Sequence, residues 1–258
     1  MDTEEALRRV RLIAPMLRRD VRTAVLSHAI MEAANDTIPK GMDGTHSAFS
    51  DTYLATQNAL AMKLAMDLAR IFDLSERGRY LPEKQDKASI PVLAALLRKP
   101  DVQRGLEEDA AKWLPSVAHL GTFGPAPPGI VEAALKEAEE NHRSEDRDQC
   151  RRAIANFLAT AGRLEIDGSE EGAALGRIRE FRNRRLAHSL FDKEPEAPPR
   201  YSDLSLLLEV AAEAATHASL AVEGLNTDFG DEARRDRENA EGYAACVLDG
   251  LKRASVNQ

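Results

Sequence analysis

The sequence predicts an all-α protein, most economically an antiparallel helical bundle with additional N- and C-terminal helices. Apolar residues recur at steps of three and four in several segments, which is the spacing of one face of an α-helix. No segment alternates apolar and polar residues as a half-buried strand does. Segments rich in proline and glycine separate the periodic ones. Together these patterns predict helices packed around a common core.

The N-terminal residues 4–35 are predicted to form one long helix, or two helices that meet at Pro15, where a backbone hydrogen bond is lost. Its apolar seam includes His28, which we expect to be packed and hydrogen-bonded rather than catalytic. Arginines flank this seam and are expected to form a solvated face, with the border of an anion-binding groove as the alternative. They are Arg8, Arg9, Arg11, Arg18, Arg19 and Arg22. Residues 37–50, with Pro39, are predicted to be a loop.

The next helix is predicted over residues 51–74 and is expected to be central to the core, because leucines and an isoleucine recur along it at helical spacing. Two carboxylates belong to this helix. Asp67 lies at the edge of the apolar stripe and Asp73 near the helix end. Of the two, we expect Asp67 to be the partner of any half-buried arginine.

Four further helical segments are predicted after this one. Ser89 opens a short apolar helix, and Pro100 begins another. Prolines and glycines in residues 114–129 predict a linker. Residues 130–164 are helical at both ends with a polar centre, which fits one long helix projecting beyond the bundle or two helices with a turn. Ser169 then precedes a helix predicted to run from 169 to 191.

The C-terminal third of the chain contains two more predicted helices. Ser202 is predicted to cap the first of them, and Gly230 precedes a last amphipathic helix. The length of 258 residues suits one domain with extensions or two small domains. We expect an N-terminal helix and loop packed on the bundle (1–50), the bundle itself (51–226) and a C-terminal amphipathic helix (227–258).

The charge and cysteine content narrow the class of protein. A net charge of −8 argues against a generally basic nucleic-acid-binding surface, so any RNA or DNA contact must be local. Cys150 and Cys246 are too few for a disulfide framework or a zinc site and fit a reducing compartment. The acidic N-terminus does not resemble a secretory signal, and no apolar run approaches the ~18 residues of a membrane span. We therefore expect a cytoplasmic protein with no membrane partner.

The common cofactor motifs are absent from the sequence. There is no glycine-rich phosphate loop, no His-Glu-x-x-His, no paired-cysteine metal site and no nucleophile elbow. We therefore expect neither a cofactor nor a metal site. What remains is a locally basic helix end, where residues 177–188 contain five arginines, one histidine and one glutamate.

Arg182 is the unusual residue of this segment, because on a helical wheel it falls within an apolar stripe. That stripe consists of Leu175, Ile178, Phe181, Leu186 and Leu190. Unpaired burial of an arginine costs several kcal/mol, so Arg182 must either bind a buried carboxylate or line an opening for an anion. His188 follows ~9 Å further along a straight helix and ~120° around it, which is too divergent for the two to clamp one phosphate. A second copy related by a two-fold axis would bring two of each residue to one cleft.

The arrangement of Arg182-Asn183 followed by His188 resembles the motif of the HEPN superfamily of small helical-bundle proteins. The helix over 51–73, the segment 87–102 and Tyr201-Ser202-Asp203-Leu204 are similar to its abortive-infection branch, and the resemblance covers residues 51–225. The terminal helices lie outside it.

Many members of this superfamily are metal-independent endoribonucleases that act as toxins or phage-defence effectors, with composite sites in dimers. The resemblance implies that His188 activates the RNA 2′-hydroxyl or protonates the leaving oxygen, near its ordinary pKa of ~6.5. It implies that Arg182 stabilises the pentacoordinate phosphate and that Asn183 orients these groups. Arg184 and Arg185 would hold flanking phosphates. Leu190 occupies the position where some toxins carry a tyrosine that their antitoxin modifies, so control by that modification is not expected.

Two functions of different classes follow from the sequence. The first is an RNA-cleaving or RNA-binding defence or toxin–antitoxin effector that acts as a homodimer, with RNA and an antitoxin protein as partners. The second is a non-catalytic helical interaction module, in which Arg182 forms a structural salt bridge with a core acid and His188 caps a helix. Binding of a nucleotide or another small anion without RNA is a third alternative.

Overall fold

The computed structural model describes residues 1–42, 49–74, 81–113, 128–186 and 199–256. Throughout these ranges the regular structure is helical, and they contain no strand, so the predicted all-α class is confirmed. In order, the elements are α1 (Thr3–Met42), α2 (Ser50–Ile71), η1 (Pro82–Lys84), α3 (Ile90–Leu97), α4 (Pro100–Ala110), α5 (Pro128–Arg163), α6 (Glu170–Phe181), η3 (Arg182–Leu186), α7 (Tyr201–Glu223) and α8 (Phe229–Val256).

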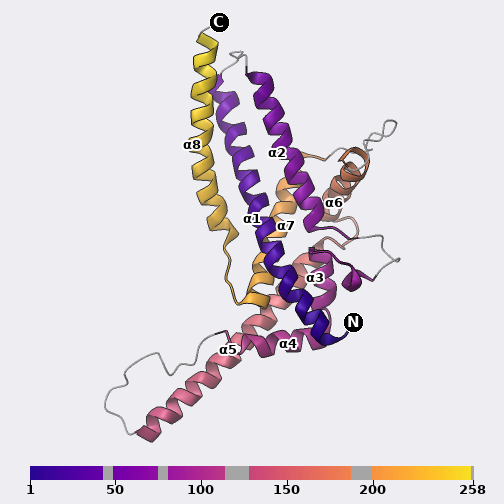
Figure 1. Cartoon of the computed structure of the whole chain (residues 1–258), viewed down its shortest axis with the longest axis vertical. Coiled ribbons are helices and arrows are strands. Elements are labelled where there is room, and N and C mark those ends of the chain that lie inside the picture. The colour runs from indigo at the N-terminus through magenta and orange to yellow at the C-terminus, as the bar shows by residue number, and fades with distance from the viewer. Residues whose placement is uncertain (43–48, 75–80, 114–127, 187–198, 257–258) are drawn as a thin grey trace.

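The 40-residue helix α1 runs along the axis of the molecule, with α8 and α2 beside it and α7 behind (Figure 1). It continues through Pro15, so the single-helix alternative is correct. The side chains around the proline, Ile13, Ala14 and Leu17, are buried, and their burial offsets the lost hydrogen bond. The helix also continues to Met42, so the loop predicted from residue 37 is wrong in its first part. Residues 43–48 lie outside the described ranges.

One continuous core joins α1 to α2, α3, α4, α5, α6 and α7. Its largest fully buried side chains include Leu17 and Met31 of α1, Leu68 of α2 and Phe157 of α5. In α2 only the C-terminal half is buried, while Leu54 near its start is exposed. The expectation that this helix is central to the core therefore holds for residues 64–71 alone. A second, smaller apolar cluster joins α1 to α8 at the far end of the molecule.

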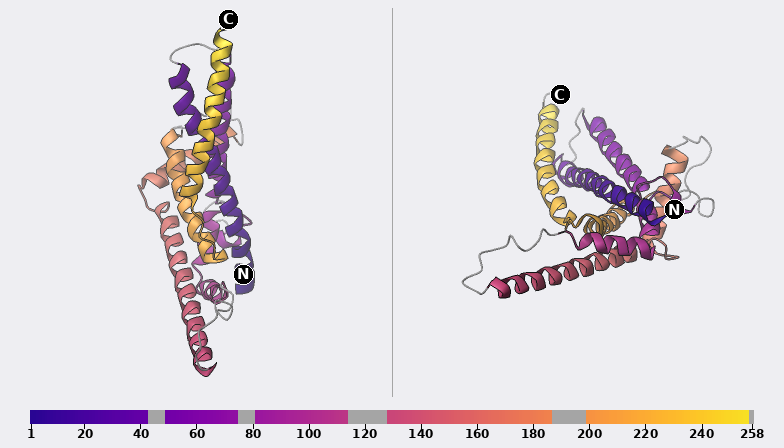
Figure 2. Two further views of the ribbon diagram at one scale, coloured as in Figure 1. Left: turned by 90° about the vertical axis from the view of Figure 1, so that its left-hand side faces the viewer. Right: turned by 60° about the horizontal axis from the view of Figure 1, so that its bottom comes forward.

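The helix α5 is a single 36-residue helix whose N-terminal part extends beyond the bundle (Figures 1 and 2). This outcome confirms the long-helix alternative. Ion pairs within the helix stabilise its polar centre, including Arg143 with Glu139 at 2.6 Å and Arg151 with Asp148 at 2.7 Å. Its C-terminal part contributes Phe157 to the core, where it packs against α7.

Three arginines of α1, Arg11, Arg18 and Arg22, form ion pairs with other helices, whereas Arg8 pairs with Glu5 of α1 and Arg19 is exposed as the solvated face predicts. Arg18 binds Glu223 of α7 at 3.1 Å, and Arg22 binds both Glu232, at 3.0 Å, and Asp236 of α8. His28 is packed and hydrogen-bonded as expected. Its Nε2 lies 3.0 Å from Ser205 Oγ, its ring stacks on Tyr201, and burial lowers its pKa.

The helix α7 has the length and mean hydropathy of a membrane span, a property that the sequence analysis did not anticipate. Half of its apolar window is buried within the bundle, against α1 and α5 among others. A core helix meets this composition test because packing on several sides requires apolar residues around most of its circumference. Cys150 and Cys246 are both free thiols, the first buried and the second exposed.

Candidate functional site

The candidate site forms where the C-terminal end of α6 meets the C-terminal end of α2. Ser169 caps the N-terminus of α6 by accepting a hydrogen bond from the backbone of Gly172 at 3.0 Å, and Leu175 and Ile178 bury one face of the helix. The apolar stripe thus orients α6 so that Arg179 and Arg182 project toward the end of α2, where both contact it.

The regular α-helix ends at Phe181, and residues 182–186 continue as the π-helical segment η3. The predicted α-helix is therefore wrong for residues 182–186, and its last residues, 187–191, lie outside the described ranges. In a π-helix the backbone bonds run from residue i to i+5, so side chains follow one another at a different angle from that of the α-helical wheel. The angular separation inferred for Arg182 and His188 assumed an α-helix throughout, and residues 182–186 do not form one. Short π-helical segments within helices frequently mark functional sites.

The guanidinium of Arg182 is held by two neighbours. Its Nη1 donates to Asp73 Oδ1 at 3.1 Å, while its Nε and Nη2 donate to the side-chain oxygen of Asn183 at 3.0 and 2.9 Å. The side chain of Arg182 remains 26% exposed. It lies at the margin of the apolar face, where the charge is paired and still in contact with solvent.

The expected partner, Asp67, does not contact Arg182. Asp67 binds Lys63 at 2.6 Å and Arg70 at 3.7 Å on its own helix. Lys63 also donates to Ser27 of α1, so this part of α2 faces α1 rather than α6. Asp73 lies beyond the last turn of α2, where the chain leaves the helix beside α6, and this position brings its carboxylate to Arg182.

Asp73 is shared with a second cation, Lys87, whose Nζ lies 2.7 Å from Oδ2. Partial burial of the carboxyl raises its pKa, but the hydrogen bonds from Lys87 and Arg182 outweigh that effect, so the pKa of Asp73 is lowered overall. Sequence reasoning missed Lys87 as part of this site. The available signal was its place at the start of the segment 87–102 on which the resemblance partly rested.

Two side chains fix the backbone that carries Asp73. Arg179 Nη2 donates to the carbonyl of Phe72 at 2.7 Å, and Ser89 Oγ donates to the carbonyl of Asp73 at 2.6 Å. Both satisfy carbonyl groups at the end of α2, where a positive charge also complements the helix dipole. The hydroxyl of Ser89, although this residue precedes α3, thus stabilises the end of α2 instead of capping α3.

The other predicted site residues are Arg184, Arg185 and His188, and the structure describes only the first of these side chains. Arg184 binds Glu180, one turn earlier, at 2.8 Å. Arg185 belongs to η3, but its side chain lies outside the described part of the structure, as does His188. In the described ranges, no group of three histidine, cysteine, aspartate or glutamate side chains is arranged to hold a metal ion.

A buried ion pair joins α6 to the start of α7. Arg177 binds Asp203 through two hydrogen bonds of 2.8 and 2.6 Å. Asp203 also accepts a hydrogen bond from the backbone of Arg200 at 2.7 Å and so caps α7. The prediction that Ser202 caps this helix is wrong, because Arg200 occupies the cap position and Asp203 supplies the accepting side chain.

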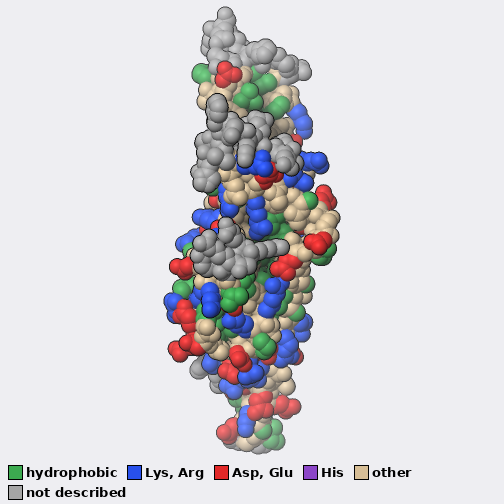
Figure 3. Space-filling model, turned by 90° about the vertical axis from the view of Figure 1, so that its right-hand side faces the viewer, with side chains coloured by type: hydrophobic (Ala, Val, Ile, Leu, Met, Phe, Trp, Pro, Cys, Tyr) green, Lys and Arg blue, Asp and Glu red, His purple; other side chains and the backbone are tan. Residues whose placement is uncertain are grey.

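Figure 3 shows the face of the molecule that carries α6, where cationic and acidic side chains are intermixed rather than gathered into one basic surface. Near the site, a hollow of about 420 Å³ lies between the start of α1 and residues 84–88. Its charged lining is mainly cationic, with Arg8, Arg9, Lys84 and Lys87 against Glu5 and Asp86.

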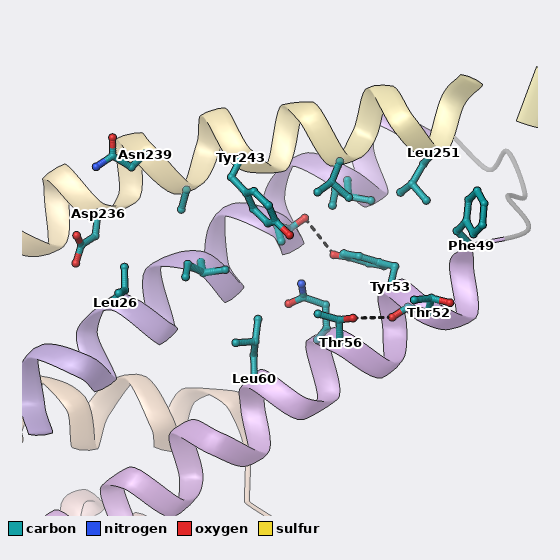
Figure 4. A pocket seen from close by; sticks show the side chains of 16 residues that line it. Leu26, Phe49, Thr52, Tyr53, Thr56, Leu60, Asp236, Asn239, Tyr243 and Leu251 are labelled. Carbon is teal, nitrogen blue, oxygen red and sulfur yellow. Dashed lines mark hydrogen bonds between the residues drawn. The ribbon is translucent and has the colours of Figure 1, made fainter. Parts of the chain in front are cut away.

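A larger groove of about 580 Å³ lies between α1, α2 and α8, toward the end of the molecule where the C-terminus lies (Figures 1 and 4). Figure 4 shows Leu26, Leu60, Tyr53 and Tyr243 facing it, and the Tyr53 hydroxyl donates to the carbonyl of Ala34 at 3.1 Å. Among the described residues that line it, Asp236 alone is charged, and it is bound to Arg22. These lining residues therefore offer no cation to a phosphate, whereas the end of α6 does.

A family comparison covers most of the chain. The AbiU2 family model, of HEPN type, matches residues 13–243. The chain belongs to the AbiU2 family. Searches of curated proteins and of solved structures found no match. The matched range includes most of α1 and the first half of α8, so it extends well beyond the residues 51–225 that carried the resemblance. This AbiU2-family protein is accordingly an abortive-infection-associated HEPN protein.

Proposed function

We propose that this AbiU2-family protein is a metal-independent endoribonuclease that acts as an RNA-targeting toxin or phage-defence effector. The observation that carries the proposal is the position of Arg182. Its guanidinium is oriented by Asn183 and Asp73, it is partly exposed, and it lies at a π-helical segment six residues before His188. Within the described part of the chain, two of its five N–H groups have no partner and remain for an anion.

The reaction we propose is transfer of the phosphodiester to the neighbouring ribose hydroxyl. The His188 imidazole accepts the 2′-hydroxyl proton as O2′ forms a bond to phosphorus. The bond from phosphorus to O5′ then breaks, and O5′ takes up a proton from an imidazolium or from water. The products are a 2′,3′-cyclic phosphate and a 5′-hydroxyl. Arg182 stabilises the additional negative charge on the phosphate oxygens as it develops.

A homodimer is part of the proposal, because the reaction uses both a base and an acid and each chain contributes one histidine to the motif. Two copies related by a two-fold axis would supply a neutral imidazole and an imidazolium to one cleft. Arg184 and Arg185 would then bind flanking phosphates. In this proposal the protein acts in the cytoplasm, and an antitoxin protein restrains it.

Expression in bacteria tests the activity. We expect the wild type to arrest growth and His188→Ala to be tolerated, while His142→Ala, on the projecting part of α5, arrests growth like the wild type. Purified protein should cut RNA in the presence of a chelator and leave 2′,3′-cyclic phosphate ends. Equal tolerance of the wild type and His188→Ala, or strict dependence on magnesium, would contradict the proposal.

A non-catalytic interaction module is the second candidate, and the ion pair between Arg182 and Asp73 favours it. In that case Arg182 would serve stability alone. Replacement of Arg182 by Gln would then lower the free energy of unfolding and leave RNA binding and growth unchanged. Loss of RNA cleavage with little loss of stability would exclude this candidate.

A further inference from the structure

The carboxylate of Asp73 binds one N–H group of Arg182 and also faces Lys87, so it lies where a phosphate held by both cations would lie. One of its oxygens accepts from Arg182 at 3.1 Å and the other lies 2.7 Å from the ammonium of Lys87. The three residues come from different segments, namely the end of α2, the chain before α3 and the start of η3. A single negative charge therefore faces two positive charges, and the cluster retains a net positive charge.

The three charged groups are accessible to solvent. The side chains of Arg182, Asp73 and Lys87 are 26%, 25% and 30% exposed. Ion pairs in contact with solvent contribute little to stability. Exchange of the carboxylate for another anion would therefore cost little, provided that the new anion forms comparable hydrogen bonds with the same cations.

The backbone around Asp73 is fixed independently of the carboxylate. Ser89 and Arg179 bind the carbonyls of Asp73 and Phe72, so the end of α2 keeps its place when the carboxylate loses its partners. Only the side chain of Asp73 has to rotate away. Asn183 continues to hold two of the N–H groups of Arg182 during that exchange.

Lys87 connects the cluster to the cationic hollow beside α1. It lines that hollow together with Arg8, Arg9 and Lys84. A polyanion bound at Arg182 would therefore meet further positive charge on the Lys87 side. A polymer of phosphates gains more from this arrangement than a single small anion does, because each neutralised phosphate releases counterions.

We propose that Asp73 is a resident counter-anion which an RNA phosphate displaces from Arg182, and that Lys87 then becomes a second ligand of that phosphate. This inference rests on the proposed function and deepens it, because it assigns an RNA-binding role to Lys87 and an autoinhibitory role to Asp73. In the absence of RNA, Asp73 neutralises and orients the cations. When RNA binds, its phosphate takes over the hydrogen bonds that the carboxylate gives up.

Asp73→Asn tests the displacement step, and Asp67→Asn is its matched control, since Asp67 lies in the last turns of α2 just before Asp73 and also binds two cations. Binding of a single-stranded RNA oligonucleotide is measured by fluorescence anisotropy, with every protein carrying His188→Ala so that the probe stays intact. Asp73→Asn should bind about five- to tenfold more tightly than its parent, because removal of a competing charge favours the phosphate. Asp67→Asn should stay within about twofold. Unchanged or weaker binding by a folded Asp73→Asn protein would overturn the inference.

Lys87→Gln tests the second ligand, with Lys63→Gln as its control on the Asp67 side of α2. We expect Lys87→Gln to weaken RNA binding about fivefold or more and to lower the slope of log affinity against log salt by about 0.7, the value for one phosphate contact on a single strand. Lys63→Gln should change neither quantity. An unchanged slope in Lys87→Gln would overturn the assignment of Lys87.

Cleavage assays on the same substitutions, made with His188 intact, distinguish this inference from the proposed function. RNA cleavage together with unchanged binding in Asp73→Asn would overturn the inference alone. If the predicted binding changes occur without any RNA cleavage, the inference holds and the proposed ribonuclease activity is excluded. Failure of every variant to bind RNA would overturn both.

Discussion

Arg177 and Arg182 lie on one continuous helical segment, and each binds an aspartate from another part of the chain, yet their environments differ. Arg177 binds Asp203 through two hydrogen bonds, and the two side chains are only 19% and 4% exposed. Arg182 binds Asp73 through one hydrogen bond, and these side chains are 26% and 25% exposed. Asp73 is shared with Lys87, whereas Asp203 also caps a helix.

The comparison shows how one helix combines a structural arginine with one suited to binding an anion. The Arg177 pair is closed, because the carboxylate accepts two hydrogen bonds from the guanidinium and one from the backbone of Arg200. Removal of either charge would leave the other buried without compensation. The Arg182 pair is in contact with solvent, and two N–H groups of its guanidinium have no partner among the described residues. Burial and the completeness of hydrogen bonding, rather than the residue types, distinguish the two pairs.

The largest expected effect follows from breaking the buried pair. Arg177→Ala should lower the free energy of unfolding by about 3 kcal/mol, because Asp203 would stay buried without its cation. Urea denaturation followed by circular dichroism measures this change. Arg8→Ala, which removes an exposed pair with Glu5, is the control and should alter stability little. A similar, small loss in both variants would show that the Arg177 pair is not structural.

A smaller effect on stability and a larger effect on binding are expected at the open pair. Arg182→Gln should lower the free energy of unfolding by about 1 kcal/mol or less, while the affinity for single-stranded RNA falls about tenfold or more. Denaturation and fluorescence anisotropy on the same preparation give the two values. If Arg182→Gln lost as much stability as Arg177→Ala, Arg182 would be a structural residue like Arg177.

The smallest expected effect is in the acid dependence of stability. The hydrogen bonds from Arg177 lower the pKa of Asp203 from its ordinary value of 3.8, and the pKa of Asp73 is also lowered. Between the unfolded and folded pKa values the unfolded state binds more protons, so stability present above about pH 4 falls as the pH drops through the folded pKa values. Denaturation curves over this range should depend less steeply on pH in Asp203→Asn and in Asp73→Asn.

Salt separates the two contributions to that acid dependence. Added salt should diminish the contribution of the partly exposed Asp73 and leave that of the buried Asp203 nearly unchanged, because buried pairs are screened much less. Equal salt sensitivity in both variants would contradict the assignment of one pair as open and the other as closed.

Helix positions could be predicted well from the sequence because they depend on local patterns. The apolar spacing led to both ends of α2 and to the start of α6 within a few residues, whereas the predicted end at residue 191 lies well beyond Phe181, where α6 ends. Ser169 was read correctly as the start of α6, since an N-cap depends on the next three residues alone. The resemblance to the abortive-infection branch of the HEPN superfamily likewise followed from a motif and its neighbours in order, and the AbiU2 family match confirms it.

Partners across the fold could not be predicted in this way. Arg182 and Asp73 are separated by 109 residues, and the choice of Asp73 over Asp67 depends on which side of α2 faces α1. The π-helical geometry of η3 was also missed, because an α-helical wheel assumes one angle per residue throughout. Lys87 and Ser89 reach the site only because the chain folds back after α2.

The sequence by itself determined the all-α class, the order of the helices and the segment that carries Arg182, Asn183 and His188, because hydrophobic periodicity and capping act over a few residues. Only the tertiary structure decided which carboxylate meets which arginine, and hence which arginine is structural and which remains open to an anion. Burial and pairing of charges arise when distant helices pack together, and that packing is not contained in any local pattern.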